Sequence, residues 1–278
     1  MSLFADRTGR LPPEVRGLVG EFRDHLSKFL GKNLVGAYLF GSIAFPEYEP
    51  RAGDLDFYTV TRTQLSPENV SDLDVMHRYL AAKFEFGRKL DGFYIPLTKA
   101  RRSRSPRGLV YAAHGTIHRG GFDDAWALHR EHFHRGSYIR LHGPRPREIF
   151  PPADWASIRK DLYRALAYTR SIIRSDPWWA VLNLCRLVYT FKTGNVAVSK
   201  LQAAKWALET YESTWRPLIM SAIRTYKQRG SSKDRAVLKR DAKTFLGFAS
   251  VRVIAFDSVR DTRQPNIEYR RNRRRTAR

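Results

Sequence analysis

The stretch LFGSIAFPEYEPRAGDLDFYTV (residues 39–60) decides the fold of this chain. It reads as an apolar strand that ends in Gly-Ser, a loop with two prolines, and a second strand that begins with Asp-Leu-Asp. Because successive side chains of a strand point to opposite faces, Asp54 and Asp56 share one face and their carboxylates converge. An Asp-x-Asp by itself is typical of an ordinary acidic turn. The order of strand, Gly-Ser, loop and Asp-Leu-Asp strand instead favours a functional site.

Two neighbouring carboxylates repel each other unless a cation neutralises them. Magnesium prefers oxygen ligands and is commonly held by one or two carboxylates together with substrate phosphates. Two such ions about 3.5–4 Å apart stabilise the attacking and leaving oxygens of an in-line phosphoryl displacement. We therefore expect Asp54 and Asp56 to be catalytic metal ligands. Gly41 lets the backbone approach a phosphate, so its amide and the Ser42 hydroxyl are expected to hold the triphosphate.

A third carboxylate is expected from the next strand, predicted at residues 89–97. Asp91 begins its apolar run and is our candidate for a metal ligand, a general base for an acceptor hydroxyl, or both. The alternative is an aspartate at a strand entry that faces solvent. Glu85 is a weaker candidate because it falls in a helical or turn context.

Outside this segment, the predicted elements fall into two parts, one before and one after a boundary at residues 142–155. Helical spacing of apolar residues predicts helices at 13–31 and 67–86, whereas residues 100–150 are expected to hold loops and one or two helices around DAWALHREHF. Prolines mark a boundary at 142–155. Five helices are predicted after it: 154–174, 177–193, 199–213, 215–229 and 233–249. The predicted fold class is an α/β domain with a mixed sheet and helices (residues 1–150), an all-α helical bundle (151–262) and a basic, disordered tail (263–278).

The charge balance favours anionic partners. The chain of 278 residues carries 50 Lys and Arg against 27 Asp and Glu, a net charge of +23, which attracts nucleotides or nucleic acid. The tail RRNRRRTAR (270–278) is interpreted as a solubilising end, with nucleic acid as the alternative partner. No apolar run suits a membrane span or a signal peptide, and the lone Cys185 is interpreted as core, so we expect a cytoplasmic monomer without membrane contact.

Histidines and tryptophans carry weaker signals. The histidines of residues 114–142 match no zinc spacing and are interpreted as surface or loop residues. The tryptophans of the second half are interpreted mainly as core residues, with Trp178 the best candidate for contact with a substrate.

With these motifs in place, the Gly-Ser…Asp-Leu-Asp segment resembles the DNA polymerase β-like nucleotidyltransferase superfamily. Over roughly residues 10–215 the chain resembles one branch, the aminoglycoside adenylyltransferases of the streptomycin/spectinomycin type. The likeness continues in LHGPRPREIFPPADW (141–155) and in AVLNLCRLVYTFKTGNVAVSKLQAAKWAL (180–208). It implies an α/β nucleotidyltransferase domain, ATP as co-substrate, Mg²⁺ as cofactor and transfer of AMP to a hydroxyl of an aminoglycoside or aminocyclitol antibiotic.

The resemblance also assigns residues of the helical domain. It implies that this domain closes over ATP and that Arg186 and Lys200 bind the phosphates. Arg186 interrupts an apolar helical run, where a charge needs an anionic partner, although a salt bridge is the plainer reading. Asp176 matches the acidic residue that binds the cationic drug, and Trp178 lies beside it; Asp176 also suits a helix N-cap.

Two departures and one tension accompany the resemblance. Gly53 stands where the family has a Ser or Thr hydroxyl, and Asp91 stands where it has Glu. A protein of net charge +23 repels a polycationic drug unless the pocket is acidic, which Asp123 and Asp124 are expected to help provide. Two alternatives stay open: a nucleotidyltransferase directed at RNA or protein, and a non-catalytic RNA-binding protein on this scaffold.

Overall fold

The computed structural model describes residues 11–263, and the chain divides into two compact units between Ala165 and Leu166. This division falls inside helix α5 (Trp155–Ile172). The domain boundary expected after residue 150 stays a prediction. The basic tail, apart from residue 263, lies outside the described residues.

The first unit is built on a six-stranded mixed sheet with the strand order β5-β4-β3-β2-β1-β6. All neighbouring strands are antiparallel except the parallel pair β2 and β3. The strands are β1 (Leu34–Phe40), β2 (Leu55–Thr61), β3 (Leu90–Pro96), β4 (Arg107–Ala113), β5 (Thr116–Phe122) and β6 (Ile139–His142). The central strands β1 and β2 are almost entirely buried, as expected for strands covered on both faces.

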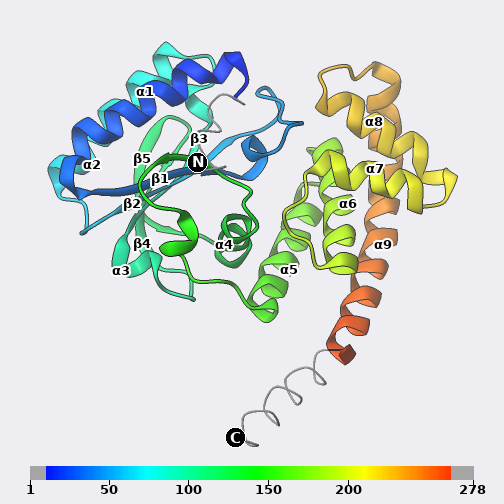
Figure 1. Cartoon of the computed structure of the whole chain (residues 1–278). Helices are drawn as coiled ribbons and strands as arrows, with labels where there is room; N and C mark the ends of the chain where they lie inside the picture. Colours follow the sequence, from blue (N-terminus) through cyan, green and yellow to red (C-terminus); the bar gives the residue numbers. More distant parts are fainter. Residues whose placement is uncertain (1–10, 264–278) are drawn as a thin grey trace, which may run out of the picture. The chain divides into compact units, whose positions relative to one another are not determined.

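Helices cover the two faces of this sheet (Figure 1). On one face, α1 (Pro13–Leu30) and α2 (Pro67–Lys83) bury an apolar stripe against Leu55 and Phe57 of β2. Both helices begin with proline at the first position, which suits a helix start, and Ser66 caps α2 by accepting from the Asn69 amide at 3.2 Å. On the other face, α3 (Leu97–Ala100) and α4 (Trp126–His134) pack with Tyr58 and Val60.

The second unit is helical, as predicted. Besides the end of α5 it contains four α-helices within the described residues: α6 (Pro177–Thr193), α7 (Lys200–Thr210), α8 (Arg216–Tyr226) and α9 (Ser232–Arg263). Helix α6 is its buried centre and ends at Gly194, whose φ of 76° is the left-handed conformation common at helix ends. Within residues 11–263 no helix combines the length and apolar character needed to cross a membrane.

The predicted fold class, a mixed α/β domain followed by helices, is confirmed. The prediction for residues 100–150 was wrong in part, because these residues also form strands β4, β5 and β6. Gly108, Gly115 and Gly120 adopt positive φ in the β4–β5 hairpin, and the glycine, arginine and histidine content removes the apolar alternation by which strands are found. The predicted end of the last helix at residue 249 was also wrong, since α9 continues to Arg263.

Candidate active site

Three predicted carboxylates gather where β2 and β3 begin. Asp56 pairs directly with Asp91 in the parallel register of these strands. Paired positions of neighbouring strands point to the same face, with strands about 4.8 Å apart. Asp54 immediately precedes β2, two residues from Asp56, and its charge acts on Asp91. The structure therefore brings Asp54, Asp56 and Asp91 to one edge of the sheet, whereas Glu85 lies in the turn after α2 and pairs with Arg51 at 3.4 Å.

The electrostatics of this edge suit a bound cation. Asp91 as a residue is exposed at the surface, but its carboxyl group is partly shielded from water, and this shielding raises its pKa. The negative charge of Asp54 raises the pKa further, whereas the charges of His114 and His129 act to lower it. A cation would relieve this repulsion. In residues 11–263, no three His, Cys, Asp or Glu side chains are spaced to hold a metal unaided. The donors thus fit Mg²⁺ held by one or two carboxylates and phosphate oxygens, and the three-ligand set stays a prediction.

Gly41 supports Asp56 from the neighbouring strand. Phe40 pairs with Asp56 in the β1–β2 register, and Gly41 follows with a φ of 69°. A Cβ atom at Gly41 would overlap Oδ2 of Asp56. The absence of a side chain at Gly41 therefore leaves the space that the Asp56 carboxylate occupies.

Replacing Gly41 by Ala is expected to abolish most activity and to lower stability by only about 1–2 kcal/mol, the strain of a left-handed alanine. The methyl group forces the Asp56 carboxylate to rotate away from its position. Gly136→Ala is the matched control, because Gly136 has a φ of 74° and nothing within 4 Å of its Cβ position. Thermal unfolding and the AMP transfer that the resemblance implies, measured on both variants, check this; equal activity losses would contradict the role of Gly41.

The loop that leads to Asp54 is held from several sides. The Ser42 hydroxyl donates to the Asp54 carbonyl at 3.2 Å, so it supports the aspartate segment, and its predicted role at a phosphate remains untested. Lys89 donates from Nζ to the carbonyls of Arg51 and Gly53 at 2.9 and 3.1 Å. A Cβ atom at Gly53 would lie 2.7 Å from both the Ser42 Oγ and a ring carbon of Tyr48. The space that a side chain at position 53 would need is therefore filled by Tyr48 and Ser42.

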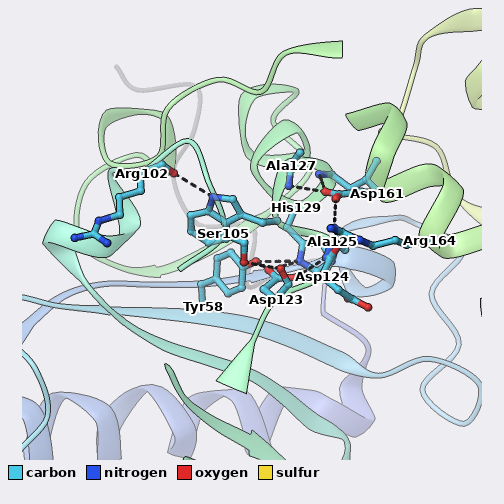
Figure 2. A network of polar contacts seen from close by, with 12 residues as sticks. Tyr58, Arg102, Ser105, Asp123, Asp124, Ala125, Ala127, His129, Asp161 and Arg164 are labelled. Atoms are coloured by element: carbon cyan, nitrogen blue, oxygen red, sulfur yellow. Dashed lines mark hydrogen bonds and ion pairs between the residues drawn. The ribbon is translucent and has the colours of Figure 1, made fainter. Parts of the chain in front are cut away.

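A buried polar network lies behind the carboxylates (Figure 2). Tyr58, two residues after Asp56 on the same strand face, donates its hydroxyl to Asp123, and His129 Nδ1 lies 2.9 Å from both the Tyr58 hydroxyl and Asp123 Oδ2. The second carboxylate oxygen of Asp123 accepts from the Ala125 amide at 2.9 Å. Asp123 is 2% exposed, so the expectation that it faces a cationic drug was wrong.

Sequence reasoning missed His129, which was interpreted as a surface or loop histidine. It lies on α4 with a half-buried ring, 4.7 Å from the centre of Phe40. Helical spacing gives the missing signal, because Trp126, His129 and Phe133 recur every three to four residues and face the sheet.

The same network fixes the start of α4. Oδ2 of Asp161 accepts from the amide of Ala127 at 2.8 Å, and Arg164 joins Asp161 Oδ1 to the Asp124 carbonyl, both at 2.8 Å. These hydrogen bonds hold the first turn of α4 in place, and so they fix the position of His129 on this helix.

His129 is tied electrostatically to the site. Burial acts to lower its pKa, but the charge and hydrogen bond of Asp123, together with the charges of Asp56 and Asp161, raise the pKa above the ordinary histidine value. Protonated His129 therefore stabilises the fold. This stability is fully present below the unfolded-state pKa of about 6.5 and is lost as pH rises through the higher pKa of the folded state.

Replacing His129 by Gln is therefore expected to destabilise the protein most on the acidic side of pH 6.5. The difference in melting temperature from the wild type should shrink as pH rises to about 9. Thermal unfolding between pH 5 and 9 measures this difference, with the exposed His142→Gln as control. A difference that does not change with pH would contradict the charged pair.

The remaining predicted residues lie in the second unit. Asp176 occupies the N-cap position of α6. Burial raises the pKa of its carboxyl group, whereas the nearby Trp179 amide and the charge of Lys200 act to lower the pKa. The Lys200 ammonium lies 4.5 Å from the centre of the Trp179 ring. Asp176, which is predicted to bind the drug, and Lys200, which is predicted to bind phosphate, thus lie close to each other.

Trp178 follows Asp176 by two residues on α6, and Arg186 lies further along the same helix. The Trp178 ring packs 6.0 Å from that of Tyr226. Arg186 is ten residues beyond Asp176, about 15 Å along the helix axis, and donates to Asn183 Oδ1 at 2.7 Å. Their predicted contacts with substrate and phosphate stay predictions.

The first unit thus carries paired carboxylates where β2 and β3 begin, next to a Gly-Ser turn, and a helical unit follows it in the sequence. The fold matches the crystal structure of spectinomycin adenyltransferase AAD(9) from Enterococcus faecialis with ATP and spectinomycin. The TM-score is 0.68 at 18% identity, over 85% of this chain and 98% of that one.

Sequence comparisons point to the same group. Residues 148–250 match the family model described as aminoglycoside adenylyltransferase, C-terminal domain. The chain is 33% identical over 109 residues to an aminoglycoside (3'') (9) adenylyltransferase of Escherichia coli, and 34% identical over 94 residues to one of Klebsiella pneumoniae. These matches cover 37% and 32% of this chain and only 39% and 34% of the relatives. The predicted resemblance to the aminoglycoside adenylyltransferases is confirmed.

Proposed function

We propose that this protein transfers AMP from ATP to a hydroxyl group of an aminoglycoside or aminocyclitol, with Mg²⁺ as cofactor. The observation that carries the proposal is the pairing of Asp56 with Asp91, next to Asp54, at the edge of a sheet of this fold. The matching family model of the C-terminal domain supports this substrate class over others.

The roles of the residues follow from their chemistry. Asp54 and Asp56 would hold Mg²⁺, which would supply positive charge against the phosphates. Asp91, which pairs with Asp56 in the strand register, takes the proton of the acceptor hydroxyl as general base. The substrate oxygen bonds to the α-phosphorus, the bond from that phosphorus to the bridging oxygen breaks, and pyrophosphate leaves.

The helical unit supplies charges to both substrates in this proposal. Arg186 and Lys200 bind the triphosphate, and Asp176 binds an ammonium group of the drug beside Trp178. The raised pKa of Asp176 reflects a carboxylate held away from water, where a cationic partner is favoured most strongly.

The test is incubation of the protein with ATP, Mg²⁺ and either spectinomycin or streptomycin, followed by mass spectrometry for an added AMP. We expect an adduct with at least one of the two drugs, and an unchanged yield after deletion of residues 270–278. No drug adduct, together with AMP transfer to RNA or protein that vanishes on this deletion, would favour a macromolecule-directed enzyme instead.

Asp176→Asn is expected to raise the KM for the drug about 10-fold or more, the effect of losing one charge-assisted hydrogen bond, and to leave the KM for ATP unchanged. Steady-state kinetics against each substrate separate the two effects. Glu209→Gln, an exposed change on α7, serves as control. An equal rise in both KM values would remove Asp176 from the drug site.

A further inference from the structure

Five exposed arginines lie on the connection from α3 to β4, at the first residue of β4 and on β5. They are Arg101, Arg102, Arg104, Arg107 and Arg119, named here the arginine patch, and all five are exposed. Residues 97–122 contain no Asp or Glu. Among the ion pairs of the described residues, none neutralises an arginine of the patch. The patch is therefore a concentration of uncompensated positive charge, which an anionic partner would stabilise.

The loop that carries this charge is fixed by hydrogen bonds to its backbone. The Trp126 indole donates to the Arg102 carbonyl at 3.1 Å, and Arg130 Nη2 donates to the Ser103 carbonyl at 2.8 Å. Lys99 donates to the Arg107 carbonyl at 2.9 Å. The carbonyls thus face the protein, and Figure 2 shows the Arg102 guanidinium directed away from the polar network. A fixed loop loses little conformational entropy when a ligand binds.

Aromatic rings interleave with these charges. Phe122 is 39% exposed, and the Arg107 guanidinium lies 5.2 Å from its ring centre. The exposed His118 stacks on Tyr111 with ring centres 5.0 Å apart and an angle of 25°. Both arrangements belong to the β4–β5 hairpin, whose outer strand β5 forms an edge of the sheet. Guanidinium groups suit phosphates, and exposed rings suit stacked bases.

The start of the β4–β5 hairpin is separate from the candidate active site. Ala112 of β4 pairs with Gly92, next to Asp91, whereas Arg107 pairs with Phe122 at the other end of the hairpin. The five steps from Arg107 to Ala112 span about 17 Å of strand. A ligand on Arg107 and Phe122 therefore need not occupy the carboxylate site, and His118, which pairs with Tyr111, lies nearer to that site.

We propose that the arginine patch binds single-stranded nucleic acid without sequence preference. Arginines contact successive phosphates, and the rings of Phe122 and His118 stack with unpaired bases. Phe122 is the large apolar side chain exposed on the described hairpin, so the surface offers little apolar area to enter a lipid bilayer. The combination of arginine and flat rings instead matches a strand with accessible bases.

The test compares binding of a fluorescein-labelled 20-nucleotide oligouridylate by the full chain and by the triple variant Arg101→Gln, Arg104→Gln, Arg119→Gln. We expect the variant to bind at least about 10-fold more weakly at 0.1 M salt. Its slope of log affinity against log salt should be smaller by about 2, since each lost phosphate contact removes about 0.7 for a single strand. The basic tail is the same in both proteins, so the difference reports the patch.

The control is Arg235→Gln, Lys239→Gln, Lys243→Gln on α9, which removes the same charge from exposed positions. Equal weakening by both triple variants would overturn the proposal, because net charge alone would then explain binding. Phe122→Leu is expected to weaken the binding of oligouridylate at least about fivefold, because a stacking ring is lost. Unchanged binding by this variant, or tighter binding of a duplex of the same length, would also overturn the proposal.

Two further measurements separate the patch from other roles. Vesicles of phosphatidylserine and phosphatidylcholine should not bind in a patch-dependent way; loss of vesicle binding with retained oligouridylate binding would assign the patch to membranes instead. AMP transfer to the drug should be unchanged in the patch variant, so failure of the proposed enzyme activity and failure of this proposal remain distinguishable.

Discussion

Asp56→Asn is expected to reduce AMP transfer by roughly 10³-fold and to leave the protein folded. Asp56 lies between Gly41 and Asp91 at the sheet edge, so its loss removes a central donor for the cation. A charge contact with the transition state worth about 4 kcal/mol corresponds to this change in rate. Removal of one carboxylate also relieves repulsion at the edge, so the melting temperature should be equal or slightly higher.

Asp72→Asn is the matched control, because Asp72 is exposed on α2. Initial rates at several Mg²⁺ concentrations and thermal unfolding are measured for both variants. Near wild-type turnover by Asp56→Asn would show that the metal assignment is wrong. A large loss of stability in this variant would instead make Asp56 a structural residue.

Arg130→Met is expected to produce the largest loss of stability, at least about 3 kcal/mol. Arg130 is 0% exposed and donates to the carbonyls of Pro151, Pro152 and Ser103 at 2.8–2.9 Å. Methionine fills similar volume but leaves three buried acceptors without a donor, each at a cost of about 1–3 kcal/mol. The segment before α5 and the loop before β4 then lose their common anchor.

Denaturant unfolding measures this effect, with Arg135→Met on the same helix as control. Arg135 is half exposed and pairs with Glu131 one turn away, so its loss should change stability by less than about 1 kcal/mol. Similar effects at both positions would contradict the role assigned to the Arg130 hydrogen bonds.

Local patterns were sufficient for the central part of the fold. Strands β1 and β2 were predictable because apolar runs are bounded by Gly-Ser and Asp-Leu-Asp, and α1 because its apolar residues follow a single face. The same alternation placed Asp54 and Asp56 together. Asp91 was found as the neighbour of Asp56 because its strand begins with a similar pattern, although its chemical role stays a prediction.

Features that depend on distant partners could not be predicted. His129 and Asp123 become a pair only when α4 packs on β2, where Tyr58 completes the network. Arg130 is an ordinary charged residue in sequence, and its burial depends on carbonyls 21 to 27 residues away. The β4–β5 hairpin is half exposed and glycine-rich, so its strands lack the alternation of apolar and polar residues by which strands are predicted from a sequence.

The contact between Gly53 and Tyr48 restricts the order in which this site can change during evolution. A serine at position 53 would meet the Tyr48 ring and the Ser42 hydroxyl in the present protein, so this change alone yields a defective intermediate. A smaller residue at position 48, together with a shift of the Ser42 side chain, opens this space. Positions 42, 48 and 53 are therefore epistatic, and the effect of a side chain at position 53 depends on the residues at the other two.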